Sequence, residues 1–411
     1  MMRRLPIVSL FAANAISMAG NVLAAIAIPW FVLQTTGSAA QTGITGFFTV
    51  LPVVLAGFLG GALIDRLGYR PTSIIADLAS GVTVALIPLL HFTIGLQFWQ
   101  LMVLVFLGGL LDAPGTTARA ALIPELAALA KMPLERATSI GQTVERGSRL
   151  IGAPLAGLLI AVMGTANVLW LDAASFLISA AVVAVTIRPR TTAPRPAPQG
   201  KYFDEILSGL RFVRGHQLVL SLVTILMVTN FLDAAFSGVI LPVYVIRVFG
   251  SATNLGAIFA AFGGGAVLGG IVFGAIGHRL PRYATFVALF TLAGLQYWTF
   301  ALYQPFWVIL IAAAIGGIAA SPLNPIIETA LYERVPSGMR GRVFGSITAG
   351  AWLTMPAGML LSGFLTETFG LQTLLIALSL TYPLATLSML FIPALRELDR
   401  RIAPGKIAGD L

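Results

Sequence analysis

Gly60-Gly61-Ala62-Leu63-Ile64-Asp65-Arg66-Leu67-Gly68-Tyr69-Arg70-Pro71 is a short polar stretch that separates two long apolar runs. Gly68 suits a tight turn, because glycine adopts backbone angles that other residues avoid. Pro71 can sit in the first turn of the next helix, where no amide hydrogen bond is needed. We therefore expect a very short polar loop between two membrane-spanning helices.

The composition of the chain also indicates a membrane protein. Hydrophobic residues make up 57% of the 411 residues and charged residues 10%, whereas a soluble protein carries about 25% charged residues. The net charge of +9 comes from basic residues dispersed over short loops, which fits the positive-inside rule better than a nucleic-acid-binding patch. With no cysteine and three separated histidines, neither disulfides nor a metal site is expected.

Twelve stretches are long enough to span a membrane, which takes about 20 apolar residues. Their approximate cores are 7–33, 41–63, 72–92, 98–118, 139–163, 166–187, 219–246, 254–276, 284–303, 306–327, 343–365 and 371–392. Of the 25 lysines and arginines, 22 fall in the termini and the even-to-odd loops. This asymmetry predicts that both termini are cytoplasmic. The fold class predicted is an all-α integral membrane protein.

The polar stretch resembles a signature of the major facilitator superfamily, G-x-L-x-D-R-x-G-R/K-R/K, which lies between the second and third helices. Six residues match it: Gly61, Leu63, Asp65, Arg66, Gly68 and Arg70. Tyr69 replaces the first basic residue of the final pair. The resemblance covers essentially the whole chain and implies two pseudo-symmetric bundles of six helices.

The resemblance also implies a role for this loop. In the superfamily the aspartate of the signature meets the start of the eleventh helix, here around residues 341–344, and a negative charge stabilises a helix N-terminus. Asp65, Arg66 and Arg70 would then latch the cytoplasmic side closed, with Asp77 in a charge relay around Asp65 and Arg70. Simple topological anchoring by positive charge is the alternative.

The two halves of the chain repeat each other. Residues 54–67 and 267–280 are identical at seven of fourteen positions, and His278 stands where Asp65 stands in the first copy. Parallel repeats of this kind relate the two halves of such transporters. The halves have diverged, because the charged loop is complete only in the first.

We predict four parts of the chain. They are an N-terminal bundle over 1–187, a linker over 188–218, a C-terminal bundle over 219–395 and a cytoplasmic tail over 396–411. Within the linker, apolar residues between Tyr202 and Val213 share one helical stripe, which predicts an amphipathic helix at the cytoplasmic interface. It would tether the halves; a regulatory role is the alternative.

Ionisable residues inside a span are costly and point to function. Asp233 lies near the middle of the seventh span, close to Asn230, and the first basic residue of that span is Arg247. A desolvated carboxyl there could exchange a proton near neutral pH. We predict a proton carrier facing the central cavity; the alternative is a protonated carboxyl that holds two helices together.

The fifth span carries a polar stripe. Glu145 and Arg149 are one helical turn apart in the favourable order, and Gln142 and Arg146 flank them. Asp112 on the fourth span lies at a comparable depth and could pair with Arg149 or Arg146. We expect these residues to line the cavity, with Glu145 and Asp112 as further candidates for proton coupling; a structural network between the two helices is the alternative.

Downstream on the same span, Gly147, Gly152, Pro154 and Gly157 resemble the antiporter motif of the superfamily, normally G-x3-G-P-x2-G-G. The match is partial, because Ala153 precedes the proline. A glycine face for close helix packing is the alternative. Two further acidic residues, Asp172 and Glu328, lie near span ends and are expected to be structural.

Two segments, 111–126 and 171–177, resemble the drug-efflux branch with macrolide and enterobactin exporters. This implies a monomeric exporter in a bacterial cytoplasmic membrane that moves hydrophobic or amphipathic small molecules, such as drugs, macrolides or siderophores, by alternating access. The proton gradient would drive it without a cofactor; no G-x4-G-K-S/T loop supports ATP use, and no nucleophile–base pair suggests an enzyme. The expected partners are substrate, protons and lipid, not nucleic acid. The alternatives are a lysophospholipid or lipid transporter and a non-transporting receptor or scaffold.

Overall fold

The computed structural model describes residues 4–188 and 202–400, apart from the side chains of residues 57–66, 202–207 and 337. Every regular element in these residues is helical. Twelve helical stretches within the described part are long and apolar enough to cross a membrane. The predicted all-α membrane fold with twelve spans is confirmed.

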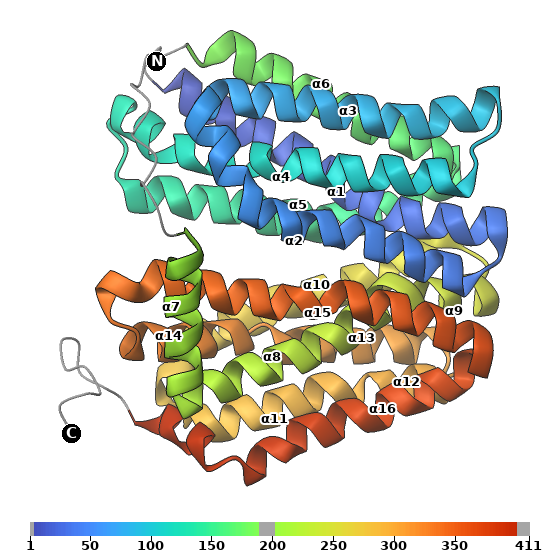
Figure 1. The fold of residues 1–411 in the computed structure, drawn as a ribbon. Coiled ribbons are helices and arrows are strands. Elements are labelled where there is room, and N and C mark those ends of the chain that lie inside the picture. The colour runs from blue at the N-terminus through green and yellow to red at the C-terminus, as the bar shows by residue number, and fades with distance from the viewer. Residues whose placement is uncertain (1–3, 189–201, 401–411) are drawn as a thin grey trace. The chain divides into compact units, whose positions relative to one another are not determined.

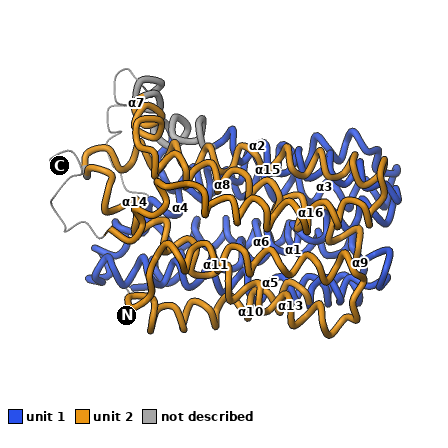
Figure 2. The backbone as a smooth tube through the Cα atoms, turned by 90° about the horizontal axis from the view of Figure 1, so that it is seen from below, with its two compact units in different colours: residues 1–199, 245–257 blue, residues 200–244, 258–411 orange. Residues whose placement is uncertain are grey.

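The chain divides into two compact units, which Figure 2 distinguishes by colour. Unit 1 comprises residues 1–199 and 245–257, and unit 2 comprises residues 200–244 and 258–411. The bundle and linker boundaries proposed from the sequence remain predictions.

Unit 1 contains the first six spans (Figure 1). They are α1 Leu5–Thr36, α2 Ala39–Leu67, α3 Tyr69–Thr93, α4 Phe98–Leu129, α5 Leu134–Met163 and α6 Thr165–Thr186. Helix α6 packs along both α1 and α3, α3 also packs along α4, and α4 contacts α2. This arrangement brings polar residues of α1, α3, α4 and α6 into one interior.

The loop between α2 and α3 is shorter than the polar stretch suggests. Helix α2 continues to Leu67 and α3 begins at Tyr69, so Gly68 alone joins them. Its φ of +81° lies in the region that favours glycine. Pro71 falls in the first turn of α3, as predicted.

The fourth span extends further than predicted. Helix α4 runs to Leu129, whereas hydropathy alone ends the span at residue 118 and leaves Arg119 in a cytoplasmic loop. Arg119 is fully buried instead. The apolar run stops there because a charged residue enters the sequence, but the helix and its packing do not stop.

Unit 2 contains most of the remaining helices. They are α7 Tyr202–Gly215, α8 Gln217–Ala235, α9 Leu241–Val248, α10 Ala252–Ile276, α11 Arg282–Leu295, α12 Tyr297–Ala301, α13 Phe306–Ala320, α14 Leu323–Arg334, α15 Arg340–Phe369 and α16 Leu371–Leu387. Short 3₁₀ turns occupy Gly277–Arg279, Ser337–Met339, Ser388–Phe391 and Pro393–Asp399. The boundary between the units runs through α9 and α10.

The seventh span is interrupted by a π-helical turn, Phe236–Ile240, between α8 and α9. Pro242 lies just beyond it and has no N–H to offer the carbonyl of Gly238, so the regular hydrogen-bond ladder cannot continue there. Such π turns are frequent at functional sites. This one begins three residues after Asp233.

Helix α7 forms within the predicted linker and packs against α15 and α8. Val213 is buried and Leu210 is exposed, and Gly209 lies against the backbone carbonyl of Arg342. The other apolar residues of the predicted stripe fall among the side chains that the structure does not describe. A tethering role for α7 stays a prediction.

Candidate functional site

Arg119 is the centre of a buried polar cluster in unit 1. Its guanidinium pairs with Asp77 of α3, and both side chains are fully buried. Its Nε donates a hydrogen bond of 2.7 Å to Asn14 of α1, and the hydroxyl of Ser179 on α6 donates one of 2.7 Å to Asp77. We call Asn14, Asp77, Arg119 and Ser179 the inner layer.

This cluster changes the expected role of Asp77. The sequence suggests a charge relay with Asp65 and Arg70, but the partners of Asp77 among the described side chains are Arg119 and Ser179. Asp77 lies about two turns along α3, a depth at which it reaches α4 and α6. Sequence analysis missed Arg119; the spacing of seven residues from Asp112 on one helix could have indicated it.

A second polar group lies two helical turns from the inner layer. It contains Asn21 of α1, Asp112 of α4, and Asp172 and Ser175 of α6, and we call it the outer layer. Asn21 Nδ2 donates a 3.0 Å hydrogen bond to Asp112, and the Ser175 hydroxyl lies 3.5 Å from Asp172.

The structure corrects the expected partner of Asp112 and shows that Asp172 is buried. Asp112 has Arg119 at 3.9 Å rather than Arg146 or Arg149 as its basic neighbour, because α4 turns this face towards α1 and α3. Asp172 is 1% exposed, so the surrounding helices enclose its side chain.

Helix α5 carries an exposed charged face. Glu145 and Arg149 form the ion pair that their spacing predicts, at 3.1 Å, with side chains 45% and 71% exposed. Gln142 and Arg146, on the same face, are also exposed. These residues begin about two turns from the start of α5. Exposed charges at such a position in a membrane-spanning helix require a polar environment, because hydrocarbon would not solvate them.

The glycines of the antiporter-like motif fall in three different environments. A side chain at Gly152 would press on Val22 of α1, and one at Gly157 would meet the backbone of Gly256. Gly147 has open space around it. Close packing therefore accounts for Gly152 and Gly157, and Pro154 lies within α5 between them.

In unit 2, Asp233 lies among aromatic rings. The Tyr297 hydroxyl donates to its carboxyl at 2.6 Å and the Tyr382 hydroxyl at 3.5 Å, and both tyrosines are 3% exposed. No ion pair to Asp233 occurs among the described residues. The nearby Asn230 donates to the Ala351 carbonyl at 3.0 Å and so ties α8 to α15.

The loop signature is described only in part. Arg70 donates hydrogen bonds of 2.5 and 2.7 Å to the carbonyls of Ile187 and Ala184 at the end of α6. Its positive charge suits a helix C-terminus. Gly61, Asp65 and Arg66 lie where the structure does not describe side chains, so the latch remains a prediction.

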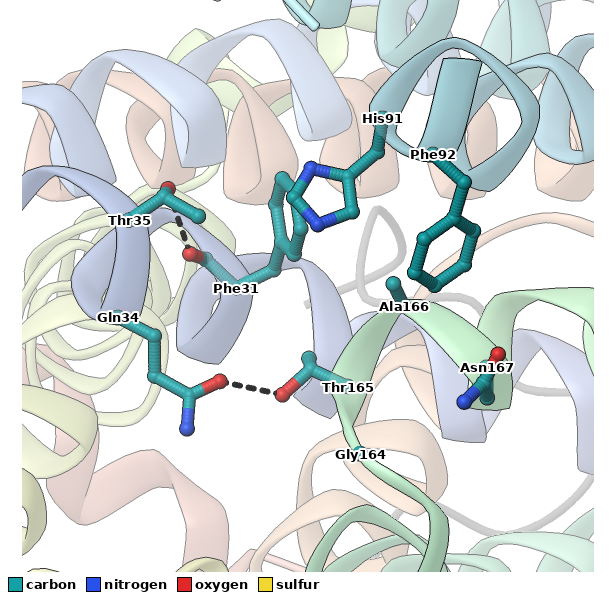
Figure 3. A pocket seen from close by; sticks show the side chains of 9 residues that line it. All are labelled: Phe31, Gln34, Thr35, His91, Phe92, Gly164, Thr165, Ala166 and Asn167. Carbon is teal, nitrogen blue, oxygen red and sulfur yellow. Dashed lines mark hydrogen bonds between the residues drawn. The ribbon is translucent and has the colours of Figure 1, made fainter. Parts of the chain in front are cut away.

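A separate pocket lies at the other end of unit 1 (Figure 3). It is formed by the end of α1, the end of α3 and the start of α6, and Gln34 accepts a 2.6 Å hydrogen bond from Thr165 at its edge. His91 packs edge-on to Phe31, with ring centroids 5.0 Å apart. None of the site residues predicted from the sequence lines this pocket.

Glu328, expected to be structural, lies on α14 and is exposed.

Solved structures show the same fold. A variant of the nucleoside transporter NupG superposes with a TM-score of 0.80 at 12% identity, over 94% of this chain and 100% of that one. A D-xylose-proton symporter superposes with a TM-score of 0.70 at 18% identity, over 95% and 98%. At these identities the similarity establishes the fold alone.

Sequence comparison is more specific. The chain is 32% identical to the multidrug efflux pump Tap of Mycolicibacterium fortuitum, over 98% of this chain and 99% of Tap. It is 22% identical to the macrolide efflux protein A of Streptococcus pyogenes, over 96% and 98%. The family described as transmembrane secretion effector matches residues 2–406. The protein is thus a multi-pass membrane transporter rather than an enzyme, and it belongs to the transmembrane secretion effector family of the major facilitator superfamily.

Proposed function

We propose that this protein is a proton-driven exporter of hydrophobic or amphipathic small molecules, working by alternating access in a bacterial cytoplasmic membrane with both termini in the cytoplasm. The substrate class and direction rest on the relatives named multidrug efflux pump and macrolide efflux protein. The observation that carries the proton coupling is the environment of Asp233.

Asp233 is suited to bind and release a proton. Its described partners are two neutral phenols, Tyr297 and Tyr382. A phenol can donate to a carboxylate and accept from a carboxylic acid, so the same two partners serve both protonation states. A carboxyl with a fixed cation beside it would be held in the charged state. A titratable group at this depth is a functional candidate by default.

The exposed face of α5 is the proposed contact for water and substrate in unit 1. Gln142, Glu145, Arg146 and Arg149 recur at the spacing of one helical face. Since a lipid environment would penalise them, we propose that they line a hydrated path. Glu145 is the second candidate for proton coupling.

The test is substrate efflux from inverted membrane vesicles under an imposed pH gradient, comparing the wild type with Asp233→Asn. We expect the gradient to drive wild-type transport, and the variant to lose that drive while it still binds substrate. Glu328→Gln is the matched control, because it neutralises an exposed carboxyl that lies outside the candidate site.

Two results would contradict the proposal. Normal gradient-driven transport by Asp233→Asn would make Asp233 structural and move the coupling to Glu145. A wild type that ignores the pH gradient would refute proton antiport, and lipid movement in liposomes would then identify a lipid transporter.

A further inference from the structure

The inner and outer layers of unit 1 are related by a repeat of seven residues on three helices. Asn14 and Asn21 lie on α1, Arg119 and Asp112 on α4, and Ser179 and Asp172 on α6. Seven residues are about two helical turns, or roughly 10 Å. Each of these three helices therefore contributes a residue to the inner layer and another, seven positions away, to the outer layer.

The two layers differ in how their carboxyl groups are satisfied. In the inner layer, Asp77 has a guanidinium and a hydroxyl. In the outer layer, Asp172 Oδ2 is buried with no hydrogen-bond partner among the described residues, and so is Asp112 Oδ1. A buried carboxylate oxygen without a donor is strongly unfavourable.

The close approach of α1 explains why Asp172 is so enclosed. A methyl group at Gly20 would overlap Ser175 Oγ and Asp172 Oδ1. Glycine therefore lets α1 pack directly over the carboxyl. Asn21, the next residue, holds Asp112, so consecutive residues of α1 touch both acids.

The buried cluster that contains the outer layer has more carboxyl groups than cations. Helix α6 packs against α1, α3 and α5. The described part of α1 has no ionisable side chain. Helix α3 carries Arg70, which bonds the end of α6, Asp77, which pairs with Arg119, and His91, which lines the pocket of Figure 3. The charges of α5 are Glu135, Arg136, Glu145, Arg146 and Arg149, of which Glu145 and Arg149 pair with each other at the exposed face.

Helix α4 adds Asp112, Arg119 and, further along the helix, Glu125. Arg119 is thus the one buried cation in the described interior of this cluster, which contains three carboxyl groups: Asp77, Asp112 and Asp172. Asp77 is paired with it, and Asp112 is 3.9 Å away. A proton on the outer layer would remove a charge that the membrane interior cannot solvate.

We propose that Asp112 and Asp172 form a second proton-binding site, inside unit 1. Asp112 is 20% exposed and Asp172 is 1% exposed, so a proton enters at Asp112 and is stored at Asp172. The binding site itself follows from the geometry of unit 1. Its part in transport rests on the proposed function, where it would add a proton-carrying step in the other half from Asp233.

The experiment is infrared spectroscopy of the purified full-length protein, titrated with pH, in an Asp233→Asn background so that this carboxyl does not contribute. The carbonyl stretch of a carboxylic acid is separate from the bands of a carboxylate. We expect Asp172→Asn to remove the signal of one protonated carboxyl. Glu328→Gln is the matched control and should keep that signal, because Glu328 is exposed and belongs to unit 2.

Asp112→Asn gives a second variant if Asp172→Asn does not fold, and it should remove or displace the same signal. The proposal is overturned if neither variant changes the protonated-carboxyl bands. It is also overturned if sodium at constant pH abolishes the band, which would make the pair a sodium site. Absence of drug export by the wild type would refute the proposed function, yet leave this spectroscopic result intact.

Discussion

Replacing Arg119 with methionine should strongly lower the free energy of unfolding. The guanidinium is fully buried and bonds Asn14 and Asp77, with Asp112 at 3.9 Å. Its loss leaves the Asp77 charge in the interior, where the Ser179 hydroxyl is the one remaining donor among the described side chains.

The magnitude follows from that orphaned charge. Removing one partner of a buried pair costs about 3–5 kcal/mol, whereas replacing both partners is often close to neutral. Arg119→Met should therefore lower the free energy of unfolding by about that amount. Arg119→Met combined with Asp77→Asn should recover most of the loss, because no buried carboxylate remains at that position.

The matched control is the exposed pair on α5. Glu145→Gln breaks an ion pair whose side chains are 45% and 71% exposed, and such pairs contribute about 0–1 kcal/mol. Unfolding by increasing dodecyl sulfate in a non-ionic detergent, followed by circular dichroism, gives the free energies. The reasoning is refuted if Arg119→Met and Glu145→Gln cost the same, or if the double variant is no more stable than Arg119→Met.

Three further predictions test single contacts. Gly68→Ala should lower the free energy of unfolding by about 1–3 kcal/mol, because φ is +81° there; the same measurement on Gly264→Ala, within α10, should show no loss. Arg70→Gln should remove hydrogen bonds to the end of α6, each about 1.5–3 kcal/mol; hydrogen exchange should then speed up at that helix end, and unchanged protection would contradict the capping role. Tyr297→Phe should alter the pH dependence of transport more than Tyr382→Phe does, because their hydroxyls lie 2.6 and 3.5 Å from Asp233; equal profiles would show that these hydrogen bonds do not tune the carboxyl.

The sequence identifies Asp233 more easily than Arg119. Asp233 interrupts a long apolar run, so its depth alone marks it. Arg119 stands where the apolar run ends, and hydropathy assigns it to a loop. Only the continuation of α4 to Leu129 and the packing of α1 and α3 around it show that the side chain is buried.

The sequence by itself determined the class of fold, the twelve spans and the superfamily signature. These depend on quantities that add along the chain: hydropathy over about 20 residues, and the spacing of a short motif. The ion pair of Glu145 and Arg149 was equally predictable, because one helical turn separates the two residues.

Only the tertiary structure decided which buried charges meet. Depth along a helix follows from residue number, but the direction in which a side chain points towards its neighbours depends on how four helices pack. That packing gave Asp77 to Arg119 instead of Arg70, and left one oxygen of Asp172 unpaired. In a low-dielectric interior, such pairings determine which carboxyl stays charged and which can take a proton.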